Sequence, residues 1–322
     1  ALSLEENLPF AQFIKLRAEI RKDPKQALAR LENLEKVATS PEAKRMVLAW
    51  RGLAFDKLQQ FGKAADSFDQ MNQLSLIQNP LPAIFPSREN SEPGIQGTLL
   101  WAPTGVRVEI VLQTLAQALG SRLLGERNLP SARTDRFGHL RGIPGSPEAG
   151  TAESWQEAIR QLGLDPETVV DWIPHFDGET VSALKGLRTV AVICDPRNAL
   201  INWLVYGSAQ AYRFDPNINI SAEWLAQTCE AFAEHLEKNP DLVSVVKIDG
   251  LPEQAASVAL ALQTALNLDE TLDEKILGLR LQARGGFDNQ FPSGHWRHYR
   301  DSFKVAFDRL TPVAVRLGYP EN

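Results

Sequence analysis

Cysteine is scarce in this sequence, because Cys194 and Cys229 are the only two among 322 residues. Two cysteines are too few for a disulfide framework or for a cysteine-based zinc site, so we expect no metal. Cys194 stands in an apolar stretch, where a free cysteine usually behaves as a small buried residue. A reducing, cytoplasmic location is the simplest expectation.

Long apolar runs and an excess of basic residues are also missing. No run approaches the roughly 20 residues that cross a bilayer, and the first residues show neither the basic nor the apolar region of a signal peptide. The formal net charge of −6 argues against a nucleic-acid partner, because phosphate binding needs a broad basic face. A small anionic ligand needs only a local positive cluster and stays compatible with this charge.

The N-terminal segment, residues 1–76, is predicted to be helical throughout. Leu28 and Leu31 recur at helical spacing with charged residues between them. Residues 48–55 and 61–68 continue this pattern and are predicted to form a pair of helices.

This second helical pair resembles a tetratricopeptide (TPR) unit, a two-helix repeat of about 34 residues. Small residues let the paired helices approach closely, and aromatic residues fill the remaining gap. The positions that carry the resemblance are Gly52, Phe55, Ala64 and Phe68. Residues 23–31 resemble the second helix of an earlier, weaker copy. A TPR unit implies a protein or peptide partner, whereas an ordinary helical hairpin explains the same pattern without one.

Residues 77–96 are rich in proline and are predicted to be a linker, and residues 97–322 to form an α/β domain on a mainly parallel sheet. Ligands on such sheets bind beyond the carboxyl ends of the strands. Residues 126–150 predict a long loop, which we interpret as a lid on the side of a second substrate. The predicted strands are 98–101, 191–193 and 242–248, and the predicted helices are 108–124, 154–162, 199–211, 221–238, 252–266 and 272–280.

Three segments combine glycine, hydroxyl and basic residues, which suit a phosphate or sulfate group. The first is residues 101–109, Trp-Ala-Pro-Thr-Gly-Val-Arg-Val-Glu. The second is residues 194–203, Cys-Asp-Pro-Arg-Asn-Ala-Leu-Ile-Asn-Trp. The third begins at Arg284 and continues through residues 291–299, Phe-Pro-Ser-Gly-His-Trp-Arg-His-Tyr.

In this order the three segments resemble those of the sulfotransferase family, and with the N-terminal helices they resemble its TPR-bearing bacterial members. The resemblance covers most of the chain. It implies a P-loop-like, three-layer α/β domain with a mainly parallel sheet. It also implies the sulfuryl donor PAPS (3'-phosphoadenosine 5'-phosphosulfate) or its product PAP.

In the first segment the family carries Pro-Arg/Lys-Ser-Gly-Thr-Thr, whose amides and hydroxyls hold the phosphosulfate. Pro103 is kept, Gly105 stands one position early, and Thr104 replaces the cation. Arg107 supplies a positive charge from the first turn of the following helix. An ordinary turn between a strand and a helix is the structural alternative.

The second segment is similar to the family's Arg-Asp-Pro-Arg-Asp-x-x-x-Ser, in which the first Arg and the Ser contact the 3'-phosphate. Arg197 matches, whereas Cys194 and Asn202 occupy the two contact positions. Asn202 still offers a hydrogen-bond donor, but Cys194 offers no charge. The structural alternative is a turn with a helix N-cap.

The third segment is similar to the family's closing loop, Val-Arg-Gln-Pro followed by Ser-x-Gly-Arg-Trp-Arg-x-Tyr, which implies basic contacts to the 3'-phosphate. His295 stands where arginine is usual, and the local basic cluster suits an anion in an otherwise acidic protein. The structural alternative is a solvated helix start with its tryptophan in the core. The matching residues are Arg284, Ser293, Gly294, Trp296, Arg297 and Tyr299.

His175 is the candidate catalytic base, because a histidine titrates near neutrality and can accept a proton from a hydroxyl. It is the last residue of the segment 171–175, Asp-Trp-Ile-Pro-His, where the family often carries Asp-Lys-x-Pro-Asn, with Trp172 in place of the lysine. A surface or capping histidine is the structural alternative. Asp171 and Asp177 nearby are expected to be solvated.

Two functional hypotheses follow. The first is a PAPS-dependent sulfotransferase with a divergent donor site, in which Arg107, Arg284 and Arg297 compensate for the missing contacts. Its acceptor is a hydroxyl of a carbohydrate, a peptide tyrosine or a small alcohol. The second is a catalytically silent sulfotransferase fold whose TPR-like helices recruit a protein.

Overall fold

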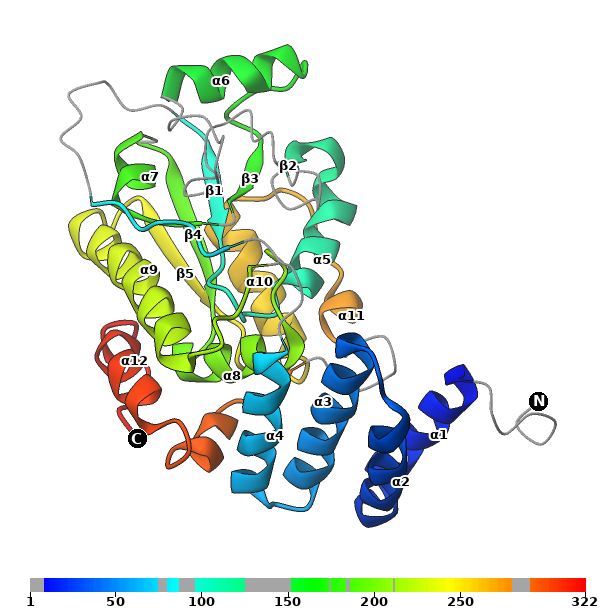
Figure 1. Ribbon diagram of the computed structural model, residues 1–322. Coiled ribbons are helices and arrows are strands. Elements are labelled where there is room, and N and C mark those ends of the chain that lie inside the picture. Colours follow the sequence, from blue (N-terminus) through cyan, green and yellow to red (C-terminus); the bar gives the residue numbers. More distant parts are fainter. Residues whose placement is uncertain are drawn as a thin grey trace.

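The computed structural model shows four N-terminal helices beside a parallel sheet that has helices on both sides (Figure 1). The described residues are 9–74, 80–86, 96–124, 152–173, 175–183, 186–210, 212–279 and 290–322. Within these ranges no helix is both long and apolar enough to cross a membrane.

The prediction of an N-terminal helical segment is confirmed. Asp23 and Ser40 each accept a hydrogen bond from the backbone amide three residues further on, and a proline follows each of them at the first helical position. Successive helices pack against each other, and the first also contacts the third, as in stacked helical hairpins. The helices are α1 (Pro9–Lys22), α2 (Pro24–Val37), α3 (Pro41–Lys57) and α4 (Phe61–Gln73).

Gly52 is the point of closest approach between α3 and α4. A methyl group added at Gly52 would lie 2.3 Å from Cε1 of Phe68, a ring that is itself only 1% exposed. The expected packing of a small residue against an aromatic one is therefore present in this hairpin.

The α/β prediction is also confirmed, because the second part of the chain holds a five-stranded parallel sheet in the order β2-β3-β1-β4-β5. Leu100 of the central strand pairs with Trp172 on one side and Val190 on the other. The strands are β1 (Thr98–Trp101), β2 (Leu123–Leu124), β3 (Val170–Ile173), β4 (Arg188–Ile193) and β5 (Val243–Lys247).

Helices cover both faces of this sheet. Figure 1 shows α9 on one side and α5 and α10 on the other, which makes three layers. Trp101 of β1 packs against α9, with its ring centre 5.0 Å from that of Phe232. The helices of this part are α5 (Glu109–Leu119), α6 (Ala152–Gln161), α7 (Gly178–Ala183), α8 (Pro196–Tyr206), α9 (Ile218–Lys238), α10 (Ala255–Leu266), α11 (Glu274–Leu277) and α12 (Lys304–Arg316), with 3₁₀ turns η1 (Gly120–Arg122) and η3 (His295–Tyr299).

Several predicted boundaries are wrong. The helix predicted over 108–124 ends at Leu119, because Gly120 turns the chain with φ +57°, and the last two residues form the edge strand β2. The helix predicted from residue 199 already begins at Pro196, because the Asp195 side chain caps it. Strand β3 was not predicted, since the buried carboxylate of Asp171 interrupts its apolar pattern.

The contact at Gly52 gives a test of the α3–α4 packing. We expect Gly52→Ala to lower the free energy of unfolding by about 1–3 kcal/mol, because the buried Phe68 ring has little room to move. Gly62→Ala in α4 is the matched control, since a methyl group there meets nothing within 4 Å. Chemical denaturation of both variants checks this, and equal stabilities would contradict the packing described.

Candidate functional site

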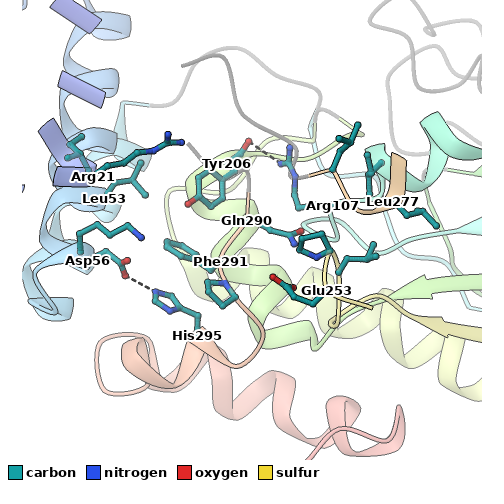
Figure 2. Close-up of a pocket in the computed structure, with 17 residues that line it drawn as sticks. Arg21, Leu53, Asp56, Arg107, Tyr206, Glu253, Leu277, Gln290, Phe291 and His295 are labelled. Carbon is teal, nitrogen blue, oxygen red and sulfur yellow. Dashed lines mark hydrogen bonds and ion pairs between the residues drawn. The ribbon is translucent and has the colours of Figure 1, made fainter. Parts of the chain in front are cut away.

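A cavity of about 300 Å³ lies between the N-terminal helices and the carboxyl edge of the sheet (Figure 2). One wall comes from α1 and α3. The other comes from the loops that follow β1 and β5, the start of α5, the end of α8, α11 and residues 290–295. We call it the shared cavity. It occupies the edge at which parallel α/β sheets bind ligands, and its lining includes Leu53, Asp56, Arg107, Tyr206, Phe291 and His295.

Arg107, predicted to contact PAPS, lines the shared cavity, but its guanidinium is bonded to groups of the protein. Its guanidinium donates to the carbonyl oxygens of Tyr206 at 3.3 Å and Gly207 at 3.2 Å, and it lies 2.8 Å from Oε1 of Glu109. The Nε atom is buried and has no hydrogen-bond partner in the described part of the chain. Because such atoms are rare in proteins, this nitrogen is a candidate ligand contact.

His295, the second predicted contact on the cavity wall, is fixed by a carboxylate from α3. Its Nε2 lies 2.7 Å from Oδ1 of Asp56, and the Tyr299 hydroxyl donates to the same oxygen at 2.6 Å. Burial and then the charge of Asp56 raise the pKa of Tyr299, which keeps its hydroxyl a donor. Asp56 was missed in the sequence, where one acidic residue near a helix end is indistinguishable from a solvated charge.

The predicted phosphosulfate loop is closed against the protein. Residues 101–108 are all buried, and Pro103 accepts a turn hydrogen bond within them. Gly105 has φ +86°, and a methyl group there would lie 2.0 Å from the carbonyl oxygen of Ala199 in α8. The Oγ1 of Thr104 is buried without a partner among the described residues. The contact with Ala199 means that only glycine at position 105 lets this loop pack onto α8.

Arg197 lies at the start of α8, where all its polar contacts go to the protein. Its guanidinium donates to both carboxylate oxygens of Asp195, at 3.0 and 2.8 Å. It also donates to the carbonyl oxygens of Pro320 at 2.5 Å and Glu321 at 2.7 Å. The side chain is 0% exposed, and it stacks 4.0 Å from the ring centre of Trp296. This arrangement fastens the last residues to α8.

Neither of the two residues at the 3'-phosphate positions offers a free cation. Cys194 is buried, and this burial, with the carboxylates of Asp249 and Asp195, raises the pKa of its thiol well above the usual value. The side-chain oxygen of Asn202 accepts the backbone N–H of Phe291 at 2.7 Å.

Asn198, one helical turn before Asn202, holds the same segment and was not predicted. Its side chain accepts the N–H of Trp296 at 3.2 Å and donates to the carbonyl of Phe291 at 3.4 Å. Two asparagines four residues apart lie on one face of a helix, and this spacing was the available signal.

The third predicted segment folds over α8, but its basic residue points elsewhere. Gly294 adopts φ +75° and Ser293 is exposed. Trp296 is 1% exposed, as the structural alternative expected. Arg297 lies 5.1 Å from the Trp296 ring centre and donates to the carbonyl of Asn322 at 2.7 Å. It does not line the shared cavity.

His175 is buried away from the shared cavity. Its Nε2 lies 3.2 Å from Oδ2 of Asp177. The other carboxylate oxygen, Oδ1, accepts from the amide and the hydroxyl of Thr180 at the start of α7. Burial opposes ionisation of Asp177, but His175 and Thr180 outweigh it and hold its pKa below the usual range. The expectation that Asp171 and Asp177 are solvated is wrong, since both are 0% exposed.

Two predicted features, Arg284 and the loop over 126–150, lie outside the described residues. Among the residues that are described, no three His, Cys, Asp or Glu side chains gather to hold a metal ion. Comparison with known protein families, with functionally characterised proteins and with solved structures finds no match to this chain.

The Asp56 carboxylate gives a test of the contact between the two parts of the chain. We expect Asp56→Ala to lower the free energy of unfolding by about 1.5–3 kcal/mol, because it leaves the buried Tyr299 hydroxyl and His295 without their acceptor. Asp69→Ala in α4 removes an exposed carboxylate and serves as the control. Thermal and chemical unfolding measure both, and equal losses would contradict a structural role for Asp56.

Proposed function

We propose that this chain is a sulfotransferase-like binding protein that does not use PAPS. Its ligand site is the shared cavity, and its N-terminal TPR-like helices recruit a protein or peptide. The TPR and sulfotransferase assignments rest on the sequence resemblance. The choice of a silent fold rests on where the described donor-contact residues lie.

The main support is that neither residue at the two positions expected to contact the 3'-phosphate is available to bind it. Cys194 is neutral and buried beside Asp195 and Asp249, so a 3'-phosphate placed there would meet carboxylates in place of an arginine. Asn202 has its side-chain oxygen bonded to Phe291. A buried anion that lacks a cationic partner is strongly disfavoured. The described residues at these positions therefore do not fit PAPS.

The arginines meant to compensate give little help among the described residues. Arg297 binds the carbonyl of Asn322 and lies outside the cavity, and Arg107 is paired with Glu109. Arg197 is fully engaged at the start of α8. Replacing charged phosphate contacts by neutral ones weakens binding by about 1.5–3 kcal/mol each.

A PAPS-dependent sulfotransferase is the second candidate, and one observation favours it. Thr104 Oγ1 and Arg107 Nε, both in the predicted phosphosulfate loop, are buried without partners in the described part of the chain. An anion site in use would supply those partners. In this case the loop opens to admit the donor, and the acceptor is a hydroxyl compound.

Calorimetric titration with PAP separates the two candidates. We expect no saturable binding up to millimolar PAP, and no sulfuryl transfer from labelled PAPS to carbohydrate, peptide-tyrosine or small-alcohol acceptors. Micromolar binding would overturn the proposal. If the double variant Thr104→Val/Arg107→Gln then lost that binding while remaining folded by circular dichroism, the donor site would be placed at the β1–α5 loop.

A further inference from the structure

The shared cavity has the chemistry of a specific ligand class. We propose that it binds a small amphipathic anion, a molecule with one carboxylate, sulfate or phosphate group on an apolar body. The inference rests on the proposed function in one respect, that the shared cavity is the ligand site. The ligand chemistry follows from the cavity walls.

The apolar body is expected because most of the wall is hydrocarbon. Side chains from both parts of the chain line the cavity, with Leu53 of α3 on one side and Phe291 on the other, and Ile110 of α5 also belongs to the lining. Ile20, Leu251 and Leu277 extend this lining. Apolar surface of this kind favours a ligand that removes it from water. A volume of about 300 Å³ is at the lower end for small-molecule sites, so the ligand is small.

The anionic group is expected because basic residues outnumber acidic ones in the cavity lining. Its acidic lining residues are Asp56 and Glu253, and its basic ones are Arg21, Lys57 and Arg107. Asp56 already accepts hydrogen bonds from His295 and Tyr299. Arg21 and Lys57 are exposed at the rim, and no ion pair joins either of them to another described residue.

Arg107 provides an independent indication. Its Nε is buried and unpartnered within the described ranges, although the other guanidinium nitrogens are bonded. Figure 2 shows Arg107 and Arg21 on opposite walls of the cavity. One anionic group in the cavity can therefore lie in the field of Arg107, Arg21 and Lys57, with its apolar body against Phe291. A hydrogen bond from a guanidinium to such a group is charge-assisted and about twice as strong as a neutral one.

The test compares ligands that have an alkyl chain in common and differ in the head group. Octanoate and octyl sulfate, below the concentration at which they form micelles, are titrated into the full chain by calorimetry beside octanol and inorganic sulfate. We expect one-to-one binding of at least one of the two amphipathic anions, with octanol about tenfold or more weaker. Which of the two binds more tightly assigns the head group.

Variants locate the binding. Arg107→Gln and, separately, Arg21→Gln/Lys57→Gln are each expected to weaken the anion about fivefold or more and to leave octanol unchanged. The second variant alters only exposed side chains, so its fold is retained even if Arg107→Gln is unstable. Lys22→Gln/Lys25→Gln removes the same charge from exposed neighbouring positions outside the cavity and is expected to bind as the unmodified chain does.

Several results would overturn the inference. They are no binding of either anion at millimolar concentration, octanol binding as tightly as the anions, inorganic sulfate binding equally well, or equal losses in the cavity and control variants. These outcomes are separate from the PAP titration. Micromolar PAP binding removes the proposed function whatever octanoate does, whereas failure of both anions with no PAP binding removes only this assignment of the ligand.

Discussion

The structure depends on how the segment from Phe291 to Tyr299 is held between its two parts. On one side Asn198 and Asn202 of α8 take up backbone groups of Phe291 and Trp296. On the other side Asp56 of α3 accepts from His295 and Tyr299. These are buried or nearly buried polar contacts, in which an unmade hydrogen bond is expensive. The segment can therefore stay docked only while both parts keep their positions.

These hydrogen bonds also explain which contacts the residues that carried the resemblance make. Asn202 stands where a phosphate contact was expected, but its side-chain oxygen accepts a hydrogen bond from the backbone N–H of Phe291. Arg197 joins α8 to the last residues, and Arg297 binds the carbonyl of Asn322. Groups suited to bind an anion thus bind backbone carbonyls and carboxylates of the protein. The polar groups of the three segments that resemble the family therefore contact the protein itself.

Much of the fold could be predicted from the sequence, because apolar spacing and caps act locally. Asp23 and Ser40 mark helix starts directly, and the apolar run before Cys194 predicts a buried strand. The two-residue strand β2 and the Asp171-bearing strand β3 could not be found, since neighbouring strands and Trp155 stabilise them rather than their own pattern. Arg107 and His295 were predicted as site residues and do line the cavity, whereas Asp56 depends on a contact 239 residues away in sequence.

The position of the shared cavity has one more consequence. Because its walls belong to α1 and α3 on one side and to the sheet edge on the other, a bound molecule touches both and adds to the free energy that joins them. Binding free energies are coupled reciprocally. A protein that engages the N-terminal helices and shifts them would change the affinity of the cavity for its ligand by some factor. The ligand would then change the affinity for that protein by the same factor, so under the proposed function the cavity would couple ligand binding to partner binding.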